Sequence, residues 1–228
     1  MLNVNAKRLL LKALATQPAL YSLFRKTNLV RFLPPNKITD YIGRILRNRV
    51  KDERKTVFID IGCNIGTASE KFLEVLRTET HIGIDANEDV LAQFSSKFPR
   101  AEPQLAAVSN RNGATTFFLD PATDGESPHN GSSMTRVGDD WRSIEVSVID
   151  FAELIEPHLD SNLVIKMDIE GAEISALQSA LDRDLDLSNL VLFLEEHRGL
   201  IKSDEYDLDL AKVVSGLERS GAIVAFWM

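Results

Sequence analysis

The stretch Thr56-Val-Phe-Ile-Asp-Ile-Gly-Cys-Asn-Ile-Gly66 sets the architecture that we expect for this chain of 228 residues. Its first half is a short apolar run of mostly β-branched residues, which predicts a buried parallel strand. Asp60 interrupts the run at its carboxyl end, and the glycine turn Gly62-x-Asn64-x-Gly66 follows. Thr67-Ala-Ser-Glu70 has the spacing of a capping box, so a helix is expected to begin there. A strand, a glycine turn and a helix N-terminus in this order form a cradle for a nucleotide.

The turn departs from the dinucleotide-binding pattern G-x-G-x-x-G, which places a pyrophosphate on a helix N-terminus. Here the pattern is D-x-G-x-N-x-G, with a carboxylate before the turn and no third glycine at the required place. A carboxylate would repel a pyrophosphate, so a nicotinamide dehydrogenase is disfavoured. It would attract a cationic ligand, such as the amino acid and sulfonium ends of S-adenosylmethionine. A tight turn without a ligand is the alternative, but a buried Asp in a strand needs a partner.

The composition is that of a globular protein with one main core, because 44% of the residues are hydrophobic. No apolar run approaches the roughly 20 residues that a membrane span needs. Cys63 is the single cysteine, so an internal disulfide is excluded and a reducing, cytoplasmic location is expected. Because Cys63 lies inside the glycine turn, we interpret it as a packed small side chain rather than a reactive thiol.

Charge divides the chain into two parts. Residues 1–55 carry 13 basic and 3 acidic side chains, whereas the remainder carries 13 basic and 31 acidic ones. We therefore expect a basic helical N-terminal extension over residues 1–55 and a Rossmann-like domain over residues 56–228. The acidic body argues against nucleic-acid binding, which needs a basic surface.

The extension has an amphipathic pattern at its end, with apolar residues between Ile38 and Leu46 opposite Arg44, Arg47 and Lys51. We expect a helical cap that covers the sheet edge or shields the active site. Basic amphipathic helices also bind anionic membranes or acidic partners, so peripheral membrane contact through this arm stays open. An organellar transit peptide ranks third; it is suggested by the absence of acids from the first 39 residues.

From Thr56 onward, strand and helix patterns alternate, which is typical of a parallel sheet with helices on both faces. Residues 121–138 are rich in Gly, Pro, Ser, Asp and Asn, so we expect a long surface loop that acts as a lid or contacts the substrate. Helices are expected after Asn87, Asp150, Glu173 and around residues 206–217. Further strands are expected at residues 81–85, 103–108, 115–119, 144–149, 162–168, 189–197 and 222–228.

The second strand ends in another acid, Asp85, which lies 23 residues after Gly62. This is close to the roughly 20-residue interval at which an acid binds a ribose in nucleotide folds. Helix capping is the plainer interpretation of Asp85, but the glycine turn favours a ribose ligand. The small residues around Ala107 in the third strand suit the wall of an adenine pocket.

Polar side chains end four of the expected strands, and ligands bind at the carboxyl ends of strands in open α/β sheets. These groups are Asp60, Asp85, Asp168 with Glu170, and the run Glu195-Glu196-His197. His197 or a carboxylate could act as a general base toward a substrate hydroxyl. Alternatively, Asp168, Glu195 or Glu196, and His197 could bind a divalent cation. We favour the base and expect no metal; Glu173 could simply favour a helix N-terminus.

Four stretches together resemble the FkbM-type S-adenosylmethionine-dependent methyltransferases. They occur in the family's order, and the K-x-D-x-E-G-x-E run is the most specific of them, whereas residues 1–55 are not covered. The stretches are Phe58–Gly66, Gly83–Asp85, Ile165–Glu173 and Glu195–His197.

The resemblance implies an α/β fold of the Rossmann-like class I methyltransferases, a mostly parallel twisted sheet with helices on both faces. It implies S-adenosyl-L-methionine as the cofactor and in-line methyl transfer to a hydroxyl of a small molecule, such as a secondary metabolite, or of a sugar or glycan. A non-catalytic cofactor-binding module that docks through the basic arm is the alternative. By resemblance, the residues expected to bind the cofactor are Asp60, Gly62, Cys63, Asn64, Gly66, Asp85, Ala86 and Ala107, and those expected to face the acceptor are Asp168, Glu170 and His197.

Overall fold

The structure is a computed structural model, and it describes residues 38–47, 49–51, 53–121, 131–135, 138–195, 197 and 204–227. The expectations for residues 1–37, for most of the loop at 121–138 and for Glu196 lie outside the described residues.

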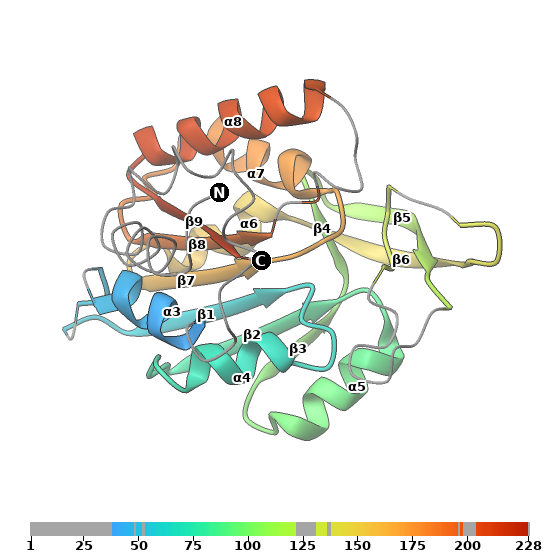
Figure 1. Cartoon of the computed structure of the whole chain (residues 1–228), viewed down its shortest axis with the longest axis horizontal. Helices are drawn as coiled ribbons and strands as arrows, with labels where there is room; N and C mark the ends of the chain where they lie inside the picture. The colour runs from blue at the N-terminus through green and yellow to red at the C-terminus, as the bar shows by residue number, and fades with distance from the viewer. Residues whose placement is uncertain are drawn as a thin grey trace, which may run out of the picture.

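A six-stranded parallel sheet forms the centre of the fold, in the order β3-β2-β1-β7-β8-β9 (Figure 1). In β1, Val57, Ile59 and Ile61 point to one face of the sheet and Phe58 to the other, since side chains alternate along a strand. All six residues of β1 and β7 are buried, which explains their apolar runs. The strands are β1 (Thr56–Ile61), β2 (Thr80–Asp85), β3 (Glu102–Leu105), β7 (Asn162–Met167), β8 (Leu190–Glu195) and β9 (Ile223–Trp227).

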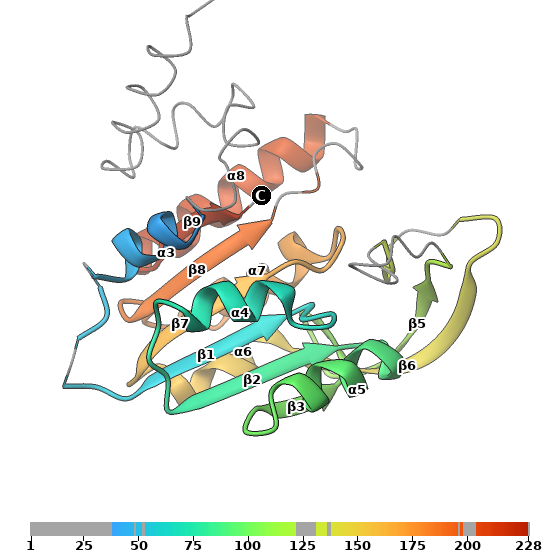
Figure 2. The same ribbon diagram turned by 60° about the horizontal axis from the view of Figure 1, so that its bottom comes forward.

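Helices cover both faces of this sheet, as the alternating pattern predicts (Figures 1 and 2). One face carries α3 (Ile38–Arg47), α4 (Thr67–Leu73) and α5 (Glu88–Lys97). The other carries α6 (Phe151–Ile155), α7 (Glu173–Asp182) and α8 (Asp204–Arg219), and a 3-10 turn, η4 (Glu156–His158), follows α6. The Rossmann-like arrangement is therefore confirmed.

A second, smaller sheet lies beyond the carboxyl ends of the main strands, in the order β4-β6-β5 (Figure 2). The single strand expected at residues 103–108 is in fact two. Residues 102–105 pair with β2, Ala106 donates its N–H to the Asp85 carbonyl at 3.0 Å, and the chain then enters the second sheet. The strands of this sheet are β4 (Ala107–Ser109), β5 (Gly113–Leu119) and β6 (Arg142–Asp150).

The helices α4 and α5 begin with different kinds of capping residue. Asn87 caps α5 as expected, because its Oδ1 accepts from the Asp89 N–H at 3.0 Å. The capping box expected at Thr67 is wrong, although α4 does begin there. Gly66 is the capping residue, with φ 82°, and no side chain bonds the helix end. Thr67 is already inside the first turn, so it cannot cap the turn that contains it.

The helix α3 packs on a face of the sheet rather than along its edge. Ile42 and Leu46 are buried against Phe58, Phe72 and Phe193 in one hydrophobic cluster. The helix therefore contributes to the main core. None of the helices in the described ranges has the length and apolar character that a membrane span needs.

Candidate functional site

The glycine turn after β1 brings the ends of three strands together. Gly62 has φ 72°, and a Cβ there would overlap the carbonyl oxygen of Asp168, which follows β7. Only glycine can therefore occupy this position. Asn64, also at positive φ, donates its backbone N–H to Asp85 Oδ2 at 2.9 Å, and Asn87 donates its own to Asp85 Oδ1 at 2.9 Å. The carboxylate at the end of β2 is thus held in place by two backbone groups.

A pocket opens between the glycine turn, the end of β2 and the second sheet. Gly62, Asn64 and Asp85 line it, and so do Ala86 and Ala107. Five of the eight residues expected to bind the cofactor are therefore brought together around one cavity.

The other three expected cofactor residues do not line this pocket. Asp60 is fully buried, Cys63 packs with Leu91 and Phe94, and a Cβ at Gly66 would overlap Phe98. Burial raises the pKa of the Cys63 thiol, in keeping with a packed, unreactive side chain. These three residues pack against the protein interior and support the turn on the side away from the pocket.

Asp60 faces a buried lysine and does not line the pocket. Its Oδ1 lies 3.5 Å from Lys166 Nζ, and its Oδ2 accepts from Ser69 Oγ at 2.7 Å. Lys166 also donates to the Gly62 carbonyl at 2.8 Å and lies 3.3 Å from Asp168 Oδ2. Burial lowers the pKa of Lys166, but the charges of Asp168 and Asp60 outweigh it and raise the pKa above its ordinary value. Lys166 lies inside the most specific motif, but no local pattern indicates its role.

Asn87 lines the pocket, although its sequence pattern indicates only a helix cap. Its side chain is 3% exposed, and its Nδ2 has no hydrogen-bond partner among the described residues. A buried amide group without a partner is costly, so its position at the pocket indicates a ligand acceptor atom. Phe117 comes from the second sheet and Met134 from the loop expected at residues 121–138, and both add apolar walls to the pocket.

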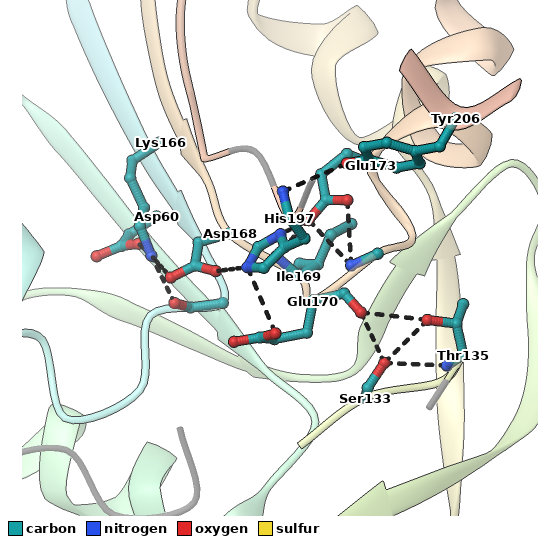
Figure 3. A network of polar contacts seen from close by, with 12 residues as sticks. Asp60, Ser133, Thr135, Lys166, Asp168, Ile169, Glu170, Glu173, His197 and Tyr206 are labelled. Carbon is teal, nitrogen blue, oxygen red and sulfur yellow. Dashed lines mark hydrogen bonds and ion pairs between the residues drawn. The ribbon is translucent and has the colours of Figure 1, made fainter. Parts of the chain in front are cut away.

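Asp168, Glu170 and His197 converge beside the pocket, and we call them the acid–histidine cluster (Figure 3). His197 Nε2 lies 3.3 Å from Asp168 Oδ1 and 3.4 Å from Glu170 Oε2. Asp168 and Glu170 line the pocket, whereas His197 is 6% exposed and lies behind them. The three expected catalytic residues are therefore in contact with one another.

The cluster is held from the far side by Glu173. His197 Nδ1 lies 2.9 Å from Glu173 Oε1, and this carboxylate also accepts from the backbone N–H groups of Ile169 and Gly171 at 3.1 to 3.2 Å. Glu173 is completely buried. Beyond its place at the start of α7, it fixes the loop that carries Asp168 and Glu170.

The loop is held on its other side by residues 131–135, which are joined to β5 by a bridge between Ser133 and Phe118 (Figure 3). Glu170 has a φ of 54°, and its carbonyl accepts hydrogen bonds from Ser133 Oγ at 2.8 Å and Thr135 Oγ1 at 3.1 Å. A non-glycine residue at positive φ costs free energy, so these bonds stabilise a strained position at the pocket.

The charged groups of the cluster shift one another's pKa values. Burial lowers the pKa of His197, but the carboxylates of Asp168, Glu170 and Glu173 raise it well above its ordinary value. Burial raises the pKa of Asp168, but Lys166 and His197 lower it below its usual range. Among the described residues, Nε2 of His197 faces Asp168 and Glu170, and Nδ1 faces Glu173. These carboxylates favour a protonated ring as long as no cation is bound, which disfavours His197 as the general base.

The metal ligands considered from the sequence are only partly brought together. Asp168 and His197 are neighbours, but the third group is Glu170 rather than Glu195. Burial and the charge of Asp168 raise the pKa of Glu195 to about 8. The spacing in the sequence could not distinguish these carboxylates, because the loop conformation selects between them.

A family model and several solved structures match this chain. The family model for the methyltransferase FkbM domain matches residues 26–209, whereas no curated protein matches the chain. The solved structure of methyltransferase FkbM from Methylobacillus flagellatus KT is 15% identical, with TM-score 0.44, over 90% of this chain and 52% of that chain. The plantazolicin methyltransferase BpumL, solved with a triazolic desmethylPZN analog and SAH, is 14% identical, with TM-score 0.35, over 90% of this chain and 63% of that chain.

The chain spans about half the length of the M. flagellatus protein. The family match begins at residue 26 and so includes α3, whereas the resemblance noted from the motifs began at residue 56; the domain boundary between residues 55 and 56 stays a prediction. Because the match covers well over half of the sequence, the chain belongs to the FkbM methyltransferase family.

Proposed function

We propose that this chain transfers a methyl group from S-adenosyl-L-methionine to a hydroxyl of a sugar, a glycan or a secondary metabolite. The observation that carries the proposal is that one pocket is lined both by Asp85, anchored by two backbone N–H groups, and by Asp168 and Glu170 of the acid–histidine cluster. A nucleoside-binding carboxylate and a pair of acceptor-facing carboxylates are what such a transfer needs at one place.

S-adenosyl-L-methionine is the cofactor of this family, and the residues of the pocket fit it. Asp85 would accept hydrogen bonds from the ribose hydroxyls, and the buried Nδ2 of Asn87 would donate to an acceptor atom of the nucleoside. Ala86 and Ala107 leave room for a flat base, and the backbone at Gly62 can approach the amino acid end closely. When bound, the cofactor supplies a methyl group already activated by its positive sulfonium.

The protein's part of the reaction is then to position a hydroxyl and to ease the loss of its proton. The lowered pKa of Asp168 keeps its carboxylate ionised, so the oxygen can accept a hydrogen bond from the hydroxyl. Lys166 and His197 hold this carboxylate from two sides. We infer that Asp168 and Glu170 contact the acceptor and that His197 and Glu173 position them.

We further propose that the protein is cytoplasmic and contacts a membrane peripherally through residues 1–55. Arg47 and Lys51 are exposed at the end of α3 and after it, so basic side chains are available on this part of the arm. The charge of the remaining body is acidic, which disfavours a polyanionic acceptor such as a nucleic acid.

A binding experiment tests the donor half of the proposal. Calorimetry of the full chain with S-adenosylmethionine, S-adenosylhomocysteine and NAD should show binding of the first two and not of NAD. Binding of NAD alone would overturn the methyltransferase proposal.

A transfer experiment tests the acceptor half. A radiolabelled methyl donor, offered with a panel of glycans and small alcohols, should label a hydroxyl, and Glu170→Gln should reduce the rate by about 100-fold or more. Glu102→Gln, an exposed acid on β3, is the matched control and should keep the full rate. Transfer that is equally fast in Glu170→Gln would remove Glu170 from the proposed machinery.

A further inference from the structure

We propose that Asp168, Glu170 and His197 bind a divalent cation at the wall of the pocket, where it holds an oxygen of the acceptor. The inference rests on the proposed function, because the cation would act on the hydroxyl that receives the methyl group. One donor atom from each of the three side chains lies within 4.8 Å of the other two.

The separations within the cluster match those between neighbouring ligands of one ion. His197 Nε2 is 3.3 Å from Asp168 Oδ1 and 3.4 Å from Glu170 Oε2. Around an octahedral ion with bonds of about 2.1 to 2.4 Å, neighbouring ligand atoms lie roughly 3.0 to 3.4 Å apart. An ion between these atoms would therefore need little rearrangement of the side chains.

Direct ion pairing accounts for these distances less well. Hydrogen bonds between an imidazolium and a carboxylate are usually about 2.7 to 2.9 Å long. Here two carboxylates face a single ring nitrogen, and both are further away than that. One proton on Nε2 cannot serve both carboxylates, whereas one cation can bind both and the nitrogen together.

The two oxygens of Asp168 have different surroundings. Its Oδ2 lies 3.3 Å from Lys166 Nζ, whereas its Oδ1 is buried and lies 3.3 Å from His197 Nε2, which is long for a contact between charged groups. A buried carboxylate oxygen with so long a contact is only weakly stabilised by it. Lys166 thus directs the other oxygen of Asp168 toward His197, at the place where a cation would satisfy it (Figure 3).

His197 is oriented as metal-binding histidines usually are. Such a ring commonly contacts a carboxylate with the nitrogen that does not bind the metal. Here that nitrogen, Nδ1, lies 2.9 Å from Glu173 Oε1, and Glu173 is itself held by two backbone N–H groups. His197 is 6% exposed, so its Nε2 can point only into the cluster.

The types of donor atom indicate which ion would bind, and their position at the pocket indicates what the ion would contact. Two carboxylates and one imidazole suit a hard or intermediate ion such as Mg²⁺ or Mn²⁺ rather than a thiophilic one. Asp168 and Glu170 line the pocket, so the remaining coordination positions face the acceptor. An acceptor with a second oxygen next to the methylated hydroxyl, such as a vicinal diol, could bind through both oxygens.

Calorimetry of the chelator-treated full chain with Mn²⁺ tests the inference. We expect one Mn²⁺ per chain and at least a tenfold rise in its Kd in Glu170→Gln. Glu173→Gln should raise the Kd by about 10- to 100-fold, because Glu173 acts through His197. Glu102→Gln should leave the Kd unchanged, and thermal unfolding of each variant shows whether it is folded.

Electron spin echo spectroscopy of the bound Mn²⁺ adds a readout that does not depend on affinity. It should show coupling to one histidine nitrogen, and this coupling should disappear in His197→Asn. A titration of S-adenosylhomocysteine in parallel separates the two proposals. If S-adenosylhomocysteine binds and Mn²⁺ does not, or if Mn²⁺ binds Glu170→Gln equally well, the cation site is overturned while the donor site stands. If Mn²⁺ binds and S-adenosylhomocysteine does not, the proposed function is overturned instead.

Discussion

The two ends of the Asn87 amide have different surroundings. Its Oδ1 caps α5 by accepting from the Asp89 N–H at 3.0 Å, and this contact fixes which way the amide points. Its Nδ2 is thereby directed away from the helix end, and it has no partner within the described part of the chain. The capping bond therefore leaves a donor at the pocket, which Asp85 also lines.

Asn87→Asp and Asn87→Ser test this donor at the scale of one residue. Both keep an oxygen that can cap α5 and remove the amide donor, so S-adenosylhomocysteine should bind about tenfold more weakly, the value of roughly one hydrogen bond. Calorimetry measures the affinity, and the melting temperature should stay near that of the unmodified chain. Only the Asp variant adds charge, so an effect seen in Asp alone would point to repulsion from Asp85. Unchanged affinity in Asn87→Ser would show that the donor does not contact the ligand.

At the scale of elements, α3 and the second sheet lie against different parts of the main sheet. The sheet β4-β6-β5 lies beyond the carboxyl ends and contributes Phe117 to the pocket. The helix α3 instead packs through Leu46 on the Phe58 face of the sheet. Between them, the buried pair of Lys166 and Asp60 links the end of β7 with the end of β1.

Leu46→Ala should therefore affect stability and not binding. Leu46 is 3% exposed, and truncating such a side chain costs about 2 to 5 kcal/mol of unfolding free energy. Urea unfolding measures this loss, and calorimetry should find S-adenosylhomocysteine binding unchanged. Arg47→Ala, on the exposed side of the same helix, is the matched control, with a change within about 0.5 kcal/mol. A folded Leu46→Ala chain that binds S-adenosylhomocysteine more weakly would show that α3 does contribute to the site.

At the scale of the whole molecule, buried ionisable groups make stability depend on pH in opposing ways. Burial lowers the pKa of His81 to about 4, so the folded state favours the neutral ring. The hydroxyl of Ser69 donates its hydrogen bond to Asp60. Ser69 Oγ can therefore only accept from His81, whose Nε2–H lies on the ring nitrogen 3.0 Å away. Burial acts on Asp60 in the other direction and raises its pKa, although Lys166 lowers it in part.

The effect of His81 on the free energy of unfolding has a definite pH dependence. In the unfolded chain histidine titrates near 6.5, so the contribution is fully present above about pH 6.5 and is lost as the pH falls toward 4. The shift corresponds to about 3 kcal/mol. His81→Gln keeps a donor for Ser69 but does not titrate, so its deficit in unfolding free energy should shrink by about that amount between pH 7 and pH 4. Urea unfolding across this range measures it, with His158→Gln on η4 as the control. A deficit that stays constant with pH would contradict the assignment.

The sequence by itself determined the α/β class, the succession of the main strands and helices along the chain, and the family. It could do so because buried parallel strands need continuous apolar runs, and a turn that passes close to another backbone needs glycine, as Gly62 shows beside the Asp168 carbonyl. It also indicated Asp85, Asp168, Glu170 and His197, since the carboxyl ends of parallel strands meet at one edge.

Only the tertiary structure decided which polar groups face the pocket and which are enclosed behind it. Asp60 and Asp85 end neighbouring strands and look alike in sequence. The side chain of Asp60 is enclosed with Lys166 and Ser69, whereas that of Asp85 reaches the pocket. The division of residues 102–109 between two sheets, and the hold of Glu173 on His197, likewise depend on segments far apart in the chain. Such contacts carry no local pattern, because the partner that satisfies a buried charge is chosen by packing and not by spacing.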